Sequence, residues 1–186
     1  MARNEREKTE LKKGILRWLL YLLIAFFCSG IMWATGGRLP LLMIPFAISV
    51  AAFETPVRSA VYACFCGLML DNMTDSLFGF YGILLLWAGL FVSVLFTLLL
   101  RRHALNVFFL NAVCTLVVLL LHYLFYIGIW GYDESGKIFL EWYIPLFFLT
   151  AVLVIPIYFL VRLLKQKLSP VVQVVPDEKS EDVIRE

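Results

Sequence analysis

Six apolar runs, separated by short polar islands, constrain the fold of this chain more than any other feature of its sequence. They fall at about residues 15–35, 39–53, 57–70, 77–100, 104–130 and 138–161. Four of them reach the roughly 20 residues that a helix needs to cross the hydrocarbon core of a bilayer. With 62% hydrophobic and 16% charged residues, the sequence predicts an all-α integral membrane protein with a single membrane domain.

The two short runs, 39–53 and 57–70, leave two arrangements open. They either cross the membrane as short helices, which gives a six-transmembrane-helix bundle, or they form a re-entrant hairpin beside four spans. Glu54 and Arg58 lie at their junction, where two charges inside hydrocarbon would be costly. This cost favours full crossings and therefore the six-helix bundle.

The basic residues predict the topology. With six spans, all Lys and Arg residues except Arg38 and Lys137 lie on one side of the membrane. Basic loops stay in the cytoplasm, so both termini are expected there, and the hairpin alternative gives the same sidedness. We expect a cytoplasmic segment at 1–14, an uncleaved first helix, a membrane domain at 15–165 and a disordered cytoplasmic tail at 166–186.

Motifs for catalysis or cofactor binding are missing from the sequence. It contains no glycine-rich phosphate loop, no nucleophile elbow and no HExxH motif. The four cysteines all lie in apolar runs, where small buried thiols are expected rather than a disulfide or a metal site. We therefore expect no enzyme activity, no cofactor and no nucleic-acid partner.

The segment from Gly67 to Gly79 places a carboxylate, Asp71, at the end of an apolar run. An acidic side chain at membrane depth costs about 2.5–3.5 kcal/mol, so it needs a specific environment. Ala60, Cys64, Gly67 and Asp71 share one helix face, which is typical of the packing seam of a bundle. Asp71 either belongs to that seam, or it bonds to a neighbouring helix end or contacts a partner protein.

Small residues recur on the next span. Gly82, Gly89, Ser93 and Thr97 form one stripe, and the turn before this span contains Asn72, Thr74, Asp75 and Ser76 as possible helix caps. Two small-residue stripes joined by a tight turn predict a closely packed antiparallel helix pair.

A polar stripe runs along the fifth span. It contains Asn111, Thr115 and His122, and in lipid such groups hydrogen-bond to neighbouring helices. The plainest interpretation of His122 is a satisfied interhelical side chain. A ligand-binding or proton-relay role would need a second ionisable group nearby, and Asp71 is the only candidate.

The run from Gly67 to Gly79 resembles the core motif of MreD, the rod shape-determining membrane protein of bacteria. In that family a "G-L-x-x-D" run ends one helix, a short polar turn follows, and "L-G" opens the next helix. Here Gly67-Leu-Met-Leu-Asp71 supplies the first part, and Phe78-Gly79 stands where Leu-Gly is usual. Leu77 replaces the proline that commonly precedes that pair. The likeness covers residues 15–165, mostly as hydropathy, and only the 67–79 stretch is motif-like.

The resemblance implies a non-catalytic scaffold in the bacterial cytoplasmic membrane. MreD-like proteins belong to the cell-elongation complex that builds lateral peptidoglycan. They bind MreC and, indirectly, MreB, RodA and a class B penicillin-binding protein. Gly67, Asp71, Gly79, Gly82 and His122 are then the candidate structural or partner-binding residues. The family's fold is similar to that of the S components of energy-coupling factor transporters.

That similarity supplies an alternative function, the substrate-binding S component of a vitamin transporter. Such subunits usually carry an Ala-xxx-Ala pattern in the first helix for docking the coupling subunit. Here the nearest match is Ala25 with Ser29, a pair of small residues that departs from the pattern. An S component also needs polar residues around an outer pocket, and few stand out beyond the stripe of the fifth span.

Overall fold

The chain folds into helices throughout the part that the structure describes. The computed structural model describes residues 2–34, 41–74, 76–100, 103–130 and 135–168. The helices are α1 (Ala2–Ala34), α2 (Met43–Ala51), α3 (Pro56–Met73), α4 (Phe80–Leu98), α5 (Ala104–Tyr123), α6 (Ser135–Ile138) and α7 (Ile144–Leu168). A π-helical turn at Leu124–Gly128 extends α5, and another at Phe139–Tyr143 joins α6 to α7. The predicted all-α class is confirmed for these residues.

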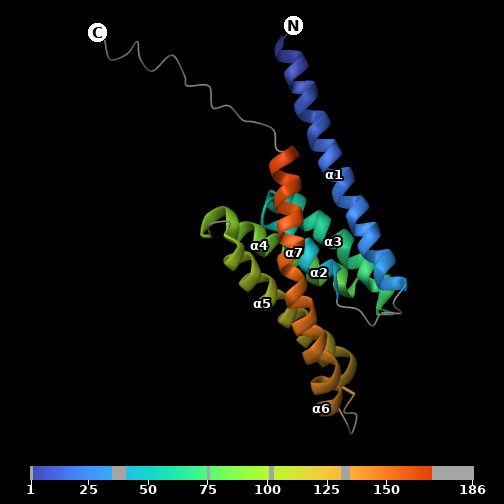
Figure 1. Ribbon diagram of the computed structural model, residues 1–186. Helices are drawn as coiled ribbons and strands as arrows, with labels where there is room; N and C mark the ends of the chain where they lie inside the picture. The colour runs from blue at the N-terminus through green and yellow to red at the C-terminus, as the bar shows by residue number, and fades with distance from the viewer. Residues whose placement is uncertain (1, 35–40, 75, 101–102, 131–134, 169–186) are drawn as a thin grey trace.

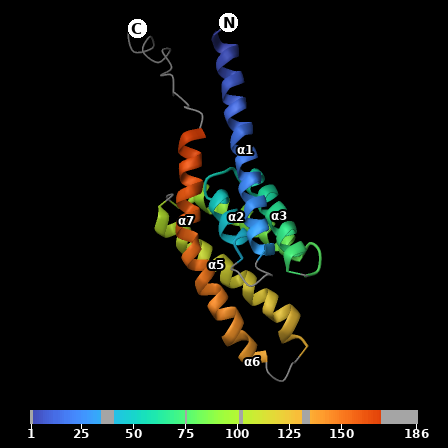
Figure 2. The same cartoon turned by 45° about the vertical axis from the view of Figure 1, so that its right-hand side comes forward.

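Four helices in the described chain are long and apolar enough to cross a membrane. They are Lys12–Ala34, Phe80–Leu98, Ala104–Gly128 and Ser135–Leu168. The start of α1 and the end of α7 point to the same end of the molecule, while α5 and α7 run together to α6 at the opposite end (Figure 1; Figure 2). The start of α1 and the end of α7 therefore lie at the same end of the helical bundle.

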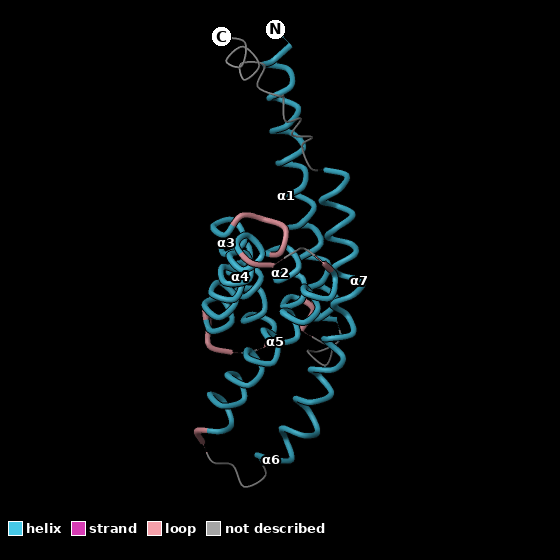
Figure 3. The backbone as a smooth tube through the Cα atoms, turned by 90° about the vertical axis from the view of Figure 1, so that its left-hand side faces the viewer, coloured by secondary structure: helices cyan, strands magenta, loops and turns pink. Residues whose placement is uncertain are grey.

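The short helix α2 lies at the centre of the molecule. All nine of its residues are buried, and it contacts α1, α3, α4, α5 and α7. Its sequence, Met43-Ile-Pro-Phe-Ala-Ile-Ser-Val-Ala51, is apolar on every side, which is the pattern of an enclosed helix. Nine residues rise only about 14 Å, less than half of the hydrocarbon thickness. Figure 3 shows α2, α3 and α4 at one level, with α5 and α7 continuing past them.

Helices α3 and α4 form the most extensive contact among the described helices, and glycines allow their backbones to approach closely. A Cβ atom added to Gly67 would lie 2.4 Å from the Tyr81 carbonyl oxygen and 2.6 Å from Gly82 Cα. A Cβ atom on Gly89 would lie 2.6 Å from the Ala63 methyl group. The predicted antiparallel pair of small-residue helices is confirmed.

The residues on the α3 side of this seam differ in part from the predicted stripe. Ser59 and Ala63 face Gly89, whereas the prediction placed Ala60 and Cys64 there. Ser59 Oγ also donates a hydrogen bond to the Gly89 carbonyl oxygen at 3.1 Å. The observed positions 59, 63, 67 and 71 are all four residues apart. They form one of the inclined ridges along which helices pack, whereas the predicted stripe followed the helix axis.

Gly67→Ala is expected to lower the free energy of unfolding by about 1–3 kcal/mol, because the added methyl group forces two backbones apart. The matched control is Gly30→Ala on α1, where an added Cβ atom meets nothing within 4 Å. The control should change stability by less than about 1 kcal/mol and on the stabilising side. Reversible unfolding in mixed detergent micelles measures both variants, and equal stability of the two would contradict the close approach.

Candidate functional site

Asp71 lies in the last turn of α3 and caps the start of α4. The residue is 2% exposed, and its carboxylate accepts hydrogen bonds from three backbone N–H groups: Gly79 at 2.9 Å, Tyr81 at 2.8 Å and Gly82 at 3.2 Å. Ser76 Oγ donates a fourth bond at 3.2 Å. The first N–H groups of a helix have no partner within the helix and carry partial positive charge, so a carboxylate there is stabilised. Of the alternatives for Asp71, this is the bond to a neighbouring helix end.

Gly79 and Gly82, whose N–H groups donate to Asp71, each require glycine for a different structural reason. Gly79 occupies the N-cap position of α4 with φ of 99°, a left-handed conformation that side chains with Cβ disfavour. Gly82 lies inside α4, where an added Cβ atom would come within 2.9 Å of Leu68 Cδ2. Of the turn residues predicted as caps, Thr74 Oγ1 donates to the Leu70 carbonyl oxygen of α3. Asp75 lies outside the described residues.

His122 bridges α5 to the turn before α7. Its Nδ1 lies 2.8 Å from the Tyr143 hydroxyl. The imidazole ring is stacked between two tyrosine rings, with centroid distances of 4.5 Å to Tyr126 and 5.4 Å to Tyr81. The other members of the polar stripe are bonded as well, because Asn111 Nδ2 donates to the Pro45 carbonyl oxygen of α2 and Thr115 Oγ1 donates to Asn111.

Asp71 and His122 lie on two sides of one residue, Tyr81. The Tyr81 backbone N–H donates to Asp71, and the Tyr81 ring stacks on His122 with 17° between the planes. The sequence could not show this relation, because 51 positions separate the two ionisable side chains. Both Asp71 oxygens accept backbone hydrogen bonds, so the carboxylate is committed to holding the start of α4.

A cavity of about 470 Å³ opens beside His122, between the α3–α4 turn and the α5–α7 pair. Its volume falls within the range of small-molecule sites in proteins. Several helices and the segments that join them contribute residues to the wall of this cavity. The described lining consists of Leu41, Thr74, Tyr81, Leu119, His122, Ile127, Ile138, Glu141, Trp142, Tyr143, Pro145, Leu146 and Leu149. Neither Tyr81 nor Glu141 was identified from the sequence, because nothing in their neighbours distinguishes them from interface residues.

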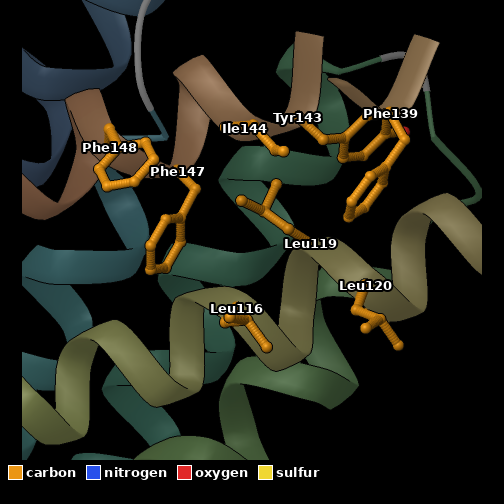
Figure 4. A pocket seen from close by; sticks show the side chains of 8 residues that line it. All are labelled: Leu116, Leu119, Leu120, Phe139, Tyr143, Ile144, Phe147 and Phe148. Carbon is orange, nitrogen blue, oxygen red and sulfur yellow. The ribbon is translucent and has the colours of Figure 1, made fainter. Parts of the chain in front are cut away.

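A second, smaller hollow of about 280 Å³ lies between α5 and α7. Figure 4 shows its apolar wall, with Leu116, Leu119 and Leu120 of α5 on one side and Phe139, Tyr143, Ile144, Phe147 and Phe148 on the other. Leu119 and Tyr143 also line the first cavity, so they separate the two spaces. Exposed apolar walls of this kind contact lipid chains in a bilayer.

A buried cluster of charges, not identified from the sequence, joins the two ends of the chain. Glu54, at the α2–α3 junction, lies 3.1 Å from Arg17 Nη2 of α1 and 3.1 Å from Lys165 Nζ of α7. The Glu54 side chain is 3% exposed and that of Arg17 is 7% exposed. Lys165 also donates to the Phe53 carbonyl oxygen, and Ser93 Oγ donates to the Glu54 carbonyl oxygen.

The cluster gives Glu54 two partners that the sequence did not predict. The cost of unpaired charges in hydrocarbon predicted only that Glu54 and Arg58 lie at the far interface of the membrane. In the structure Arg58 is exposed, whereas Glu54 is enclosed and paired with two cations. Burial of a charge is tolerated where it is paired and hydrogen-bonded. Arg17, a basic residue inside the first apolar run, was the only signal for it in the sequence, because Lys165 lies beyond the end of the last run.

The described residues offer few groups that could bind a metal ion or form a disulfide bond. No group of three or more His, Cys, Asp and Glu side chains in the described ranges could hold a metal ion. All four cysteines are free thiols, and Cys66 is buried. What the arrangement can do is to hold a small molecule beside His122 and to pack helices closely around Asp71.

Comparisons with family models, with curated proteins and with solved structures find no match for this chain. The likeness to MreD therefore depends on the motif from Gly67 to Gly79, whose geometry is described above. Function has to be argued from the residues themselves.

Proposed function

We propose that this protein is a non-catalytic membrane scaffold of the bacterial cell-elongation complex, which binds an MreC-like partner through its transmembrane bundle. The observation that carries the proposal is the geometry of the MreD-like motif. Asp71 holds the start of α4, Gly79 supplies the left-handed cap residue, and Gly67 allows the backbones of α3 and α4 to meet. Gly67, Asp71 and Gly79, which the motif shares with the family, thus each have a specific structural role.

The structural role of Asp71 supports a scaffold function for this protein rather than a catalytic function. A general base needs an accessible lone pair near a reacting group. The Asp71 oxygens instead accept four hydrogen bonds from its own chain, and the side chain is buried. In lipid, helices associate through close packing of small residues and interhelical hydrogen bonds, which is the chemistry that this bundle offers a partner helix.

The proposed location is the bacterial cytoplasmic membrane, with both termini in the cytoplasm. The basic residues support this sidedness, and the common direction of the α1 start and the α7 end fits it. We place α2 and α3 inside the membrane with the four long helices, which completes a bundle of six helical segments. Helix α2 covers only part of the thickness, enclosed by the other helices.

Affinity purification of the tagged protein in mild detergent, followed by mass spectrometry of the associated proteins, tests this function. We expect an MreC-like protein together with wall-synthesis enzymes. Gly67→Leu and Asp71→Asn should reduce both this recovery and the rod shape of cells that depend on the protein. The control Gly30→Leu places the same bulk where an added Cβ atom meets nothing within 4 Å. Unchanged partner binding and cell shape in both Gly67 and Asp71 variants would contradict the proposal.

One observation favours the alternative function, a substrate-binding S component. The cavity beside His122 has the size of a small-molecule site and contains polar side chains such as Thr74 and Tyr81. The same purification distinguishes the two functions. Recovery of a coupling subunit with paired ATPases, in place of an MreC-like protein, would identify a transporter subunit.

A further inference from the structure

We propose that the cavity beside His122 binds an organic molecule through an ammonium group. This inference goes beyond the scaffold function and does not depend on it, because the cavity lies within the chain itself. The wall combines apolar and aromatic side chains with a few polar atoms, which is the composition of small-molecule sites.

Tyr81 offers the cavity a hydroxyl that is free to bond a ligand. The residue as a whole is 2% exposed and lines the cavity, and its hydroxyl has no hydrogen-bond partner among the described residues. A ligand in the cavity can therefore hydrogen-bond to this hydroxyl without breaking a bond within the described chain.

The ring of His122 is held in place beside the cavity by its aromatic neighbours and a hydrogen bond. Both faces of its ring are covered by Tyr81 and Tyr126, and Nδ1 is bonded to the Tyr143 hydroxyl. The remaining nitrogen, Nε2, has no partner in the described chain, and His122 also lines the cavity. Because stacking and the bond to Tyr143 fix the ring, Nε2 at its edge is a hydrogen-bonding group in a fixed position.

The described lining of the cavity is negatively charged. Among these residues Glu141 is the only one with a full charge, and it has no ion pair to a described residue. An anionic ligand would find no counter-charge among the described residues of the wall. An ammonium group can donate to the Tyr81 hydroxyl oxygen and to the Glu141 carboxylate, and the nearby indole of Trp142 offers a cation–π contact. The complementary ligand is therefore a cation with an apolar body.

Calorimetric titration of the full-length protein in detergent micelles provides the test. The probe is phenethylamine, and its neutral counterpart is phenethyl alcohol, which has nearly the same shape; empty micelles correct for partitioning. We expect phenethylamine to bind about tenfold more tightly than the alcohol, since charge-assisted hydrogen bonds are the stronger ones. Equal affinity for the two probes would overturn the proposal.

Two variants locate the bound ammonium group. Glu141→Gln should weaken phenethylamine binding about fivefold, the upper limit for an exposed ion pair. Tyr81→Phe should weaken it about tenfold, because a hydrogen bond to a charged group is lost. The control Glu10→Gln removes a negative charge from α1, a helix with no residue in the described lining. Unchanged affinity in both cavity variants would also overturn the proposal.

A fold defect is separated from a lost ligand contact by thermal unfolding without ligand. Tyr81→Phe removes a hydroxyl that has no partner, so the free variant should melt at the same temperature as the wild type or higher. Weaker binding in a protein that is at least as stable supports a direct contact. A lower melting temperature without weaker binding would mean that the hydroxyl serves the fold, against the proposal.

The ammonium group can belong to a soluble amine or to the headgroup of phosphatidylethanolamine. Titration in nanodiscs of phosphatidylglycerol, with and without phosphatidylethanolamine, distinguishes these sources. Competition by phosphatidylethanolamine supports a lipid headgroup in the cavity. Undiminished phenethylamine binding in its presence supports a soluble amine.

Discussion

Replacing Glu54 by glutamine is expected to lower the free energy of unfolding by about 3 kcal/mol, because it leaves the buried Arg17 and the partly buried Lys165 without their counter-ion. Arg17 Nη2 and Lys165 Nζ both lie within 3.1 Å of the Glu54 carboxylate, and the Arg17 side chain is 7% exposed. Arg17 Nε is already buried without a hydrogen-bond partner. Reversible unfolding in mixed micelles, followed by circular dichroism, measures the change.

The control for this prediction is Arg58→Gln, which removes an exposed charge four residues away. Exposed substitutions of this kind change stability by about 0.5 kcal/mol or less. The triple variant Arg17→Met, Glu54→Leu, Lys165→Met removes all three charges and should recover most of the stability, because apolar replacements of buried ion pairs are often neutral or stabilising. A Glu54→Gln protein as stable as the Arg58→Gln control would show that the cluster does not hold the helices together.

Asp71→Ala is expected to cost about 3 kcal/mol or more, since it leaves three backbone N–H groups at the start of α4 without their acceptor. Asp71→Asn should cost less. Its single carbonyl oxygen can take the place of Oδ2 and keep the bonds from Gly79 and Gly82. Of the three backbone groups only the Tyr81 N–H then lacks an acceptor, and the Ser76 hydroxyl, which also donates to Oδ1, can rotate to another partner. The same unfolding measurement gives both values.

The neighbouring residue Asn72 is exposed and supplies the matched control. Asn72→Ala should leave stability within about 0.5 kcal/mol of the wild type. The order of stability is therefore expected to be Asn72→Ala, then Asp71→Asn, then Asp71→Ala. An Asp71→Ala protein as stable as the Asn72→Ala protein would contradict the capping role.

The sequence predicted the close pairing of α3 and α4 because small residues at helical spacing have few other uses in a membrane protein. It placed Gly67 and Gly82 correctly on this seam but assigned Ala60 and Cys64 in place of Ser59 and Ala63. Spacings of three and four are equivalent along one straight helix. Only the direction in which the partner crosses selects one of them.

For the polar residues, too, the sequence predicted one part of the arrangement and the tertiary structure decided the rest. The local pattern predicted that Asp71 needs a partner, and the structure identifies it as the backbone of α4. The positions of Tyr81 and Glu141 in the wall of one cavity depend on how α4 and the turn before α7 are both placed against α5. Such contacts join residues far apart in the chain, so no local pattern contains them.

Apolar length and composition by themselves determined that this chain is helical and has helices able to cross a membrane, because hydrocarbon tolerates few other backbone structures. The motif from Gly67 to Gly79 determined a tight hairpin. The tertiary structure alone decided that α2 is an enclosed helix, that Glu54 is paired with Arg17 and Lys165, and that a cavity opens beside His122. The physical reason is that burial and pairing energies depend on which distant segments meet.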